Sequence, residues 1–304
     1  MAAWRAILEA RARSFLAGAG PWAVSSLGRM LDTPRRLLTA AAACVVALAV
    51  LLVVVYETER GATADERALE GFGALDRPRL VEIADAIAHA ADPAPFALIT
   101  LVLVAAALWR GGVVRALAAG MILVGANVTT QVLKPILANP RGTFGEYGVA
   151  AEAFPSGHAT ASMSIALVAV VVAPSRLRPL VAVGAAGFAL AVGFSIVALD
   201  WHFPSDVAGG YLVAAGWCFA VLGGVCAYER RRATVPGRDE RPAWRLAAAA
   251  LVVPLALAAW LALERLPRVT GYAEGHTTFA VVAAVTAALV VVLVAAALTV
   301  PARR

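Results

Sequence analysis

The sequence Pro155-Ser156-Gly157-His158 leads directly into the apolar run ATASMSIALVAVVVAP over residues 159–174. This run carries no charge and no alternation of polar and apolar residues, so it indicates a helix surrounded by protein or lipid. The whole chain is 61% hydrophobic, whereas soluble domains are about 45–50% apolar. We therefore interpret residues 158–174 as one span of a helical membrane protein that starts with a polar turn.

Further apolar runs of similar length lie on both sides of this one. A hydrocarbon core about 30 Å thick needs roughly 20 helical residues to cross it, and only helices or closed barrels can span lipid. The predicted fold class is all-α, a polytopic transmembrane bundle with a six-helix core and a C-terminal two-helix hairpin. The eight predicted spans are 38–56, 94–110, 113–133, 158–174, 178–199, 206–228, 244–264 and 277–299.

The spans divide the chain into three predicted regions. Residues 1–36 form a basic N-terminal segment, for which an interfacial amphipathic helix and a partly disordered tail are equally compatible. Residues 37–228 form the six-span core, and residues 229–304 form a basic loop followed by the last two spans. In the long loop 57–93, apolar residues at helical spacing predict a short surface helix around residues 80–87.

The net charge of +6 reports topology and not nucleic-acid binding. An even number of spans places both termini on one side, and 18 of the 26 basic residues fall on that side. By the positive-inside rule this side is cytoplasmic. We therefore predict a multi-pass protein of the inner (plasma) membrane with both termini in the cytoplasm.

The same topology gathers seven residues of chemical interest at the opposite, extracytoplasmic face. The only lysine of the chain ends span 113–133, an arginine follows in the next loop, and the remaining residues begin the spans 158–174 and 206–228. Helix N-termini at this face favour bound anions. The seven residues are Lys134, Arg141, Ser156, Gly157, His158, His202 and Asp206.

These residue types suit phosphoryl transfer. A phosphate ester needs cations and N–H donors around its oxygens. A neutral histidine can attack phosphorus when its other ring nitrogen faces a carboxylate. His202 and Asp206 are four residues apart, so one helical turn would place them side by side. His158 could then protonate the leaving oxygen.

The motifs resemble those of the type 2 phosphatidic acid phosphatase (PAP2) superfamily. That family has Lys-x6-Arg-Pro, then Pro-Ser-Gly-His, then Ser-Arg-x5-His-x3-Asp. The resemblance covers about residues 95–230 and implies a membrane lipid phosphatase without cofactor or metal. It implies His202 as nucleophile, Asp206 as its orienting group and His158 as acid. It also implies that phosphate is bound by Lys134, Arg141, Ser156 and Gly157.

Two positions depart from the family pattern. Gly142 replaces the proline of the first motif, and Ile196 replaces the arginine of the third. That arginine would supply a charge-assisted phosphate contact, which is a strong one. Asp200, close to the predicted nucleophile, adds negative charge. We expect Arg265 and Arg268, in the outer loop of the C-terminal hairpin, to be candidates for replacing the missing guanidinium.

The expected function is hydrolysis of a phosphate or diphosphate monoester of a lipid at the extracytoplasmic face, through a phosphohistidine. Candidate substrates are polyprenyl diphosphates, phosphatidic acid and phosphatidylglycerol phosphate. Two alternatives stay open: a phosphotransferase of the same fold, and a catalytically weak lipid-binding or transport protein. The expected partners are the lipid substrate and membrane lipids, with no nucleic acid, and the sequence leaves the oligomeric state open.

Overall fold

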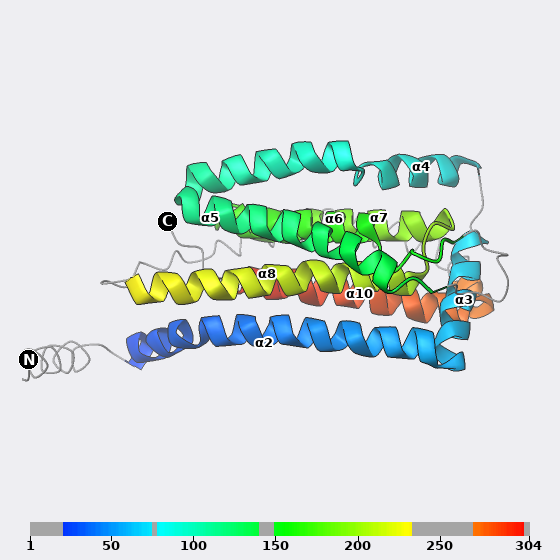
Figure 1. Cartoon of the computed structure of the whole chain (residues 1–304), viewed down its shortest axis with the longest axis horizontal. Helices are drawn as coiled ribbons and strands as arrows, with labels where there is room; N and C mark the ends of the chain where they lie inside the picture. Colours follow the sequence, from blue (N-terminus) through cyan, green and yellow to red (C-terminus); the bar gives the residue numbers. More distant parts are fainter. Residues whose placement is uncertain (1–20, 75–77, 140–148, 233–269, 301–304) are drawn as a thin grey trace, which may run out of the picture.

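The computed structural model describes residues 21–74, 78–139, 149–232 and 270–300, and it describes side chains from residue 34 onward. Within these ranges the regular structure is helical, and the long helices lie alongside one another in a bundle (Figure 1). This confirms the predicted all-α class. The helices are α2 (Pro21–Glu57), α3 (Glu59–Gly73), α4 (Pro78–His89), α5 (Pro93–Ile136), α6 (Gly157–Val172), α7 (Arg178–Ala198), α8 (Pro204–Arg232) and α10 (Thr277–Leu298).

Five of the described helices are long and apolar enough to cross a membrane. They expose large aliphatic side chains such as Val46, Leu101 and Val128, which suits a lipid-facing surface. The shorter apolar helix α6 lies inside the bundle and is mostly buried. The five helices cover Pro34–Glu57, Pro93–Ile136, Arg178–Ala198, Pro204–Arg231 and Thr277–Leu298.

The predicted spans 94–110 and 113–133 together form α5. The helix is interrupted at Gly112, which has φ 72° and ψ −174°, and the chain reverses direction there (Figure 1). A positive φ of this kind favours glycine because it lacks a Cβ. The predicted span 244–264, the residues before Pro21 and most of the predicted 229–245 loop lie outside the described residues, and the division into three regions stays a prediction.

The loop 57–93 contains two helices. The predicted surface helix is present as α4, whereas α3 was not predicted and lies across one end of the bundle (Figure 1). Thr58 caps α3, because its hydroxyl oxygen accepts a hydrogen bond from the Gly61 N–H at 3.1 Å. The buried face of α3 carries Leu69 and Phe72.

Helix α3 is held by contacts with α8 and with the segment around α10. The Asp65 carboxylate accepts hydrogen bonds from the backbone N–H of Ser205, at 3.0 Å, and from the Ser205 hydroxyl. The Tyr272 hydroxyl donates to the Gly71 carbonyl, and the rings of Phe72 and Phe279 lie 4.7 Å apart. Asp65 is buried and sits at the N-terminus of α8, where a negative charge is favourable.

Two glycines allow α8 to pack closely on the chain before α6. A Cβ at Gly210 would lie 2.6 Å from the carbonyl oxygen of Ser156, and one at Gly209 would lie 2.7 Å from the ring of Phe154. A larger residue at either position would push α8 away from the Pro-Ser-Gly-His turn. The first turns of α6 and α8, which carry predicted site residues, are therefore packed against each other.

Replacing Asp65 by alanine should loosen the attachment of α3 to α8. The buried N–H and hydroxyl of Ser205 would lose their acceptor, which typically costs about 1–3 kcal/mol. We expect the thermal midpoint of the detergent-solubilised protein to fall by several degrees. Glu66→Ala, which removes the neighbouring half-buried carboxylate, is the matched control, and equal midpoints for the two variants would contradict the role of Asp65.

Candidate active site

His202 and Asp206 meet at the N-terminus of α8. His202 Nδ1 lies 3.4 Å from Asp206 Oδ2, and it is buried without a hydrogen bond of good geometry, so the contact is electrostatic. Asp206 Oδ2 also accepts a hydrogen bond from the backbone N–H of Phe203 at 2.9 Å, as in a helix-capping arrangement. Both side chains are buried. Asp206 therefore fixes the turn that carries His202, and Nε2 is the ring nitrogen turned away from it.

His158, the second residue of α6, has its own carboxylate. Its Nε2 lies 3.0 Å from Oδ1 of Asp92, the residue that precedes α5. Asp92 was not among the predicted site residues. Its position before a proline and an apolar run signals a helix start, but contact with a histidine 66 residues away depends on tertiary packing. The contact with Asp92 makes Nε2 of His158 the hydrogen-bond donor, and Nδ1 of the same ring can then contact other groups.

Trp201 and His89 surround this pair. The Trp201 ring lies 5.6 Å from the ring of His158 and 5.8 Å from that of His89. His89 Nε2 is 4.0 Å from Asp92 Oδ2. A contact with the backbone carbonyl of Asp85, followed by the charge of that carboxylate, raises the pKa of His89. His89 is exposed, as expected for a surface residue of α4.

Ser156 links the two motifs. Its backbone N–H donates to the carbonyl of Asp206 at 2.9 Å, and its hydroxyl oxygen caps α6 by accepting from the Ala159 N–H at 3.3 Å. The N–H of Ser156 is therefore engaged by Asp206, and the predicted role of Ser156 in binding phosphate stays a prediction. The donors that remain at this helix terminus are the Ser156 hydroxyl and the first-turn N–H groups of Gly157 and His158.

Lys134 belongs to the same cluster. It lies in the last turn of α5, is half-buried, and is within Coulombic range of the carboxylates of Asp206 and Glu152. His158 in turn is within Coulombic range of Lys134 and His202. The structure thus brings together the lysine, both histidines and Asp206. Three predicted residues lie outside the described ranges: Arg141, Arg265 and Arg268.

The two positions that remove or add charge near His202, Ile196 and Asp200, have different surroundings. Ile196 is fully buried among core side chains, so the third motif contributes an apolar packing residue where the family pattern has arginine. Asp200 has φ 56° and is exposed, and its Oδ1 would lie 3.5 Å from a Cβ placed on Gly73. Its carboxylate is therefore directed toward the end of α3.

The prediction that His158 acts as an acid can be tested with Asp92→Asn, which should impair the step assigned to His158. The asparagine amide keeps the shape of the aspartate side chain and one acceptor oxygen. It removes the negative charge that holds the imidazole ring of His158. General acids contribute about 10²–10⁴ to a rate, so we expect kcat for phosphate release from a lipid phosphate to fall by about tenfold to a hundredfold with KM little changed. Asp85→Asn, an exposed carboxylate of α4 facing His89, is the control and should behave as wild type. A change confined to KM would contradict the assignment.

Comparison with known proteins gives a family match and a similar solved structure. Residues 112–232 match the PAP2 superfamily. A crystal structure of a transmembrane PAP2-type phosphatidylglycerolphosphate phosphatase from Bacillus subtilis has a similar fold, with a TM-score of 0.51 and 19% identity. The similarity covers 65% of this chain and 99% of that one.

No curated protein matches this chain. The family match and the fold together support a phosphatase of lipid substrates in general. The apolar helices agree with a protein that crosses the membrane several times. The chain is thus a multi-pass membrane protein whose residues 112–232 match the family model of the PAP2 superfamily.

Proposed function

We propose that this protein hydrolyses a phosphate or diphosphate monoester of a lipid at the extracytoplasmic face of the inner membrane. The observation that carries the proposal is the meeting of two histidines, each with its own carboxylate, at the N-termini of α6 and α8. Lys134 adds a cation to the same cluster. Both termini would lie in the cytoplasm, in accord with the distribution of arginine along the sequence.

In the first step, Nε2 of His202 attacks phosphorus while the bond to the leaving oxygen breaks. His158 delivers a proton to that oxygen from Nδ1, because Nε2 faces Asp92. In the second step, water attacks the phosphohistidine, His158 takes a proton from the water, and inorganic phosphate leaves. Each imidazole is oriented by a carboxylate on its other nitrogen, which is the arrangement that histidine nucleophiles and acids require.

The negative charge that develops on the phosphoryl oxygens needs stabilisation. Lys134 and the N-terminus of α6 supply part of it, and Arg141 is proposed to supply more. The two histidines themselves provide all the bond-making and proton transfer in this scheme, so we propose that the reaction is independent of metal. The lipid chains would lie along the bundle while the phosphate stays at its end.

The nucleophile can be tested directly with purified protein. Phosphatidic acid, phosphatidylglycerol phosphate and a polyprenyl diphosphate should include at least one substrate, and His202→Ala should reduce phosphate release by at least about 10³-fold, as expected when a nucleophile is removed. His276→Ala, a histidine outside the cluster, is the control. An acid-labile phosphoprotein formed from labelled substrate should be absent in His202→Ala.

Other outcomes of the same assay would favour another nucleophile or another function. Equal phosphate release by wild type and His202→Ala would overturn the nucleophile. A phosphoryl group recovered only on an acceptor lipid or sugar, and not as inorganic phosphate, would favour a phosphotransferase. No turnover of any lipid would favour a lipid-binding or transport protein.

Arg265 and Arg268 are proposed to supply the guanidinium that the third motif lacks, because Ile196 is buried in the core and offers no charge. A charge-assisted contact to phosphate is about twice as strong as a neutral hydrogen bond. Arg265→Ala combined with Arg268→Ala should therefore lower kcat/KM by about tenfold or more. The control is Arg60→Ala with Arg79→Ala, two exposed arginines of α3 and α4. Unchanged kcat/KM in the first pair would refute the replacement.

A further inference from the structure

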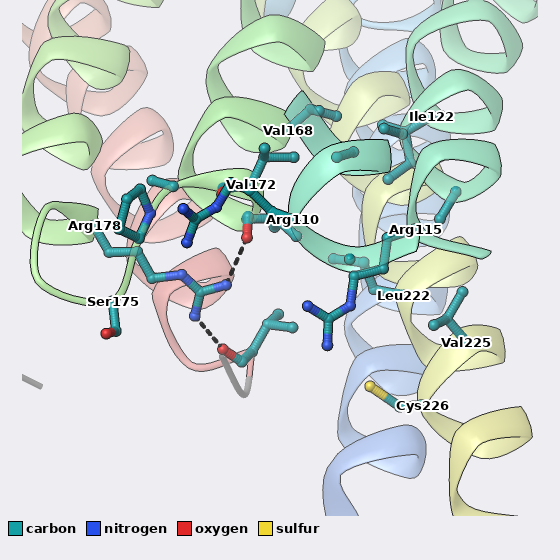
Figure 2. A pocket seen from close by; sticks show the side chains of 18 of the residues that line it. Arg110, Arg115, Ile122, Val168, Val172, Ser175, Arg178, Leu222, Val225 and Cys226 are labelled. Atoms are coloured by element: carbon teal, nitrogen blue, oxygen red, sulfur yellow. Dashed lines mark hydrogen bonds between the residues drawn. The ribbon is translucent and has the colours of Figure 1, made fainter. Parts of the chain in front are cut away.

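A second charged feature lies at the other end of the bundle. A cavity of about 590 Å³ is formed where α5 reverses, α6 and α8 end and α7 begins (Figure 2). From Gly112 to Lys134, the second half of α5 spans about 33 Å at 1.5 Å per residue. The cavity and the histidines are therefore separated by about the thickness of a bilayer core, so the cavity is no part of the site described above.

The cavity is strongly basic. Four arginines line it, and Glu229 is the one carboxylate among the described residues of its wall. Figure 2 shows the guanidinium groups of Arg110, Arg115 and Arg178 around the same space. Arg178 is within Coulombic range of Arg110 and Arg115, so these like charges repel, and an anion bound among them would offset the repulsion. The four are Arg110, Arg115, Arg176 and Arg178.

Arg178 is the most informative of the four. Its side chain is 7% exposed, its two terminal nitrogens donate to the backbone carbonyls of Val300 at 2.6 Å and Val171 at 2.8 Å, and its Nε is buried without a hydrogen bond. A buried cation is costly unless it is paired. Within the part of the chain that the structure describes, the hydrogen bonds of Arg178 reach neutral carbonyls, so an anionic ligand could balance its positive charge.

Arg110 and Arg115 bring two more guanidinium groups to the cavity. Arg110 is exposed and donates from Nε to the carbonyl of Val172 at 3.1 Å. Arg115 Nε forms an ion pair with Glu229 Oε1 at 4.0 Å. A guanidinium carries five N–H donors, and this fork of donors matches the oxygens of a phosphate.

Most of the rest of the wall is apolar. Small and aliphatic side chains from α5, α6 and α8 line the cavity beside the arginines, among them Ala118, Ile122, Val168 and Leu222. A free inorganic anion would leave this surface uncovered. A molecule with a negatively charged head and an apolar tail would match both parts of the wall.

We propose that this cavity binds an anionic phospholipid. The phosphate would lie among Arg110, Arg115 and Arg178, and part of an acyl chain would pack against the wall formed by α5 and α8. Basic pockets between transmembrane helices are suited to such head groups. The bound lipid would connect the ends of five helices, since Val300 follows α10 and Arg178 begins α7.

The test uses the full-length protein purified in a neutral detergent, with native mass spectrometry and thermal unfolding as readouts. Phosphatidylglycerol should be retained and should raise the thermal midpoint, since a ligand that binds only the folded state stabilises it. Phosphatidylcholine and inorganic phosphate are the comparison ligands and should do neither to a similar extent. Because the readout is binding, the result does not depend on the proposed phosphatase activity.

Substitutions of the cavity arginines test whether phosphatidylglycerol binds in this cavity. Arg110→Gln combined with Arg115→Gln should weaken phosphatidylglycerol binding by about tenfold or more, because two charge-assisted contacts are lost. Arg110→Gln alone removes an exposed side chain, so it should fold, and it should weaken binding several-fold. Arg231→Gln removes an exposed charge from the same end of α8 and should bind as wild type.

Three outcomes would overturn the proposal. Equal phosphatidylglycerol binding by wild type and the double variant would place the lipid elsewhere. Equal binding of phosphatidylcholine would mean that the arginines do not recognise an anion. Inorganic phosphate that binds as well as the lipid, and is lost in the double variant, would make this a free-anion site.

Discussion

Asp206 is the residue on which the arrangement of the catalytic end depends. Its carbonyl accepts the N–H of Ser156, its carboxylate accepts the N–H of Phe203, and the same carboxylate faces His202. These contacts join the start of α6 to the start of α8, so the two histidines hold fixed positions although 44 residues separate them. In an apolar bundle, a fully buried carboxylate is tolerated because donors surround it. The same donors make Asp206 both a cap and an orienting group.

A second group of carboxylates surrounds this centre. Asp65 holds the first turn of α8 from α3, and Asp92 holds His158 from the start of α5. Both come from the acidic segment between α2 and α5, which covers the end of the bundle. The long loop therefore does more than connect two spans: it supplies the partners that position both motifs.

The sequence was sufficient for the bundle and for part of the site. Apolar runs of membrane length predict the helices, and counting their directions places Lys134, His158 and His202 at one end. The roles of Asp65 and Asp92 could not be predicted, because a single acid in an acidic loop carries no periodic signal and its partner is set by packing. Helix α3 was not predicted either. The hydrogen bond from the Ser156 N–H to the carbonyl of Asp206 could not be predicted either, because it depends on how closely Gly210 lets the helices approach.

Arginine residues are unevenly distributed between the two ends of the bundle among the described residues. Inside the catalytic end, Ile196 contributes apolar packing and no charge, whereas four arginines line a cavity at the other end. These arginines lie about the thickness of a bilayer core away from the histidines, which is too far for them to contact a phosphate bound there. The proposed phosphate contacts are therefore Lys134, the N-terminus of α6 and the arginines predicted for the outer loops. The buried Arg178 must have its charge balanced locally, and the apolar wall beside it makes a lipid the ligand that fits.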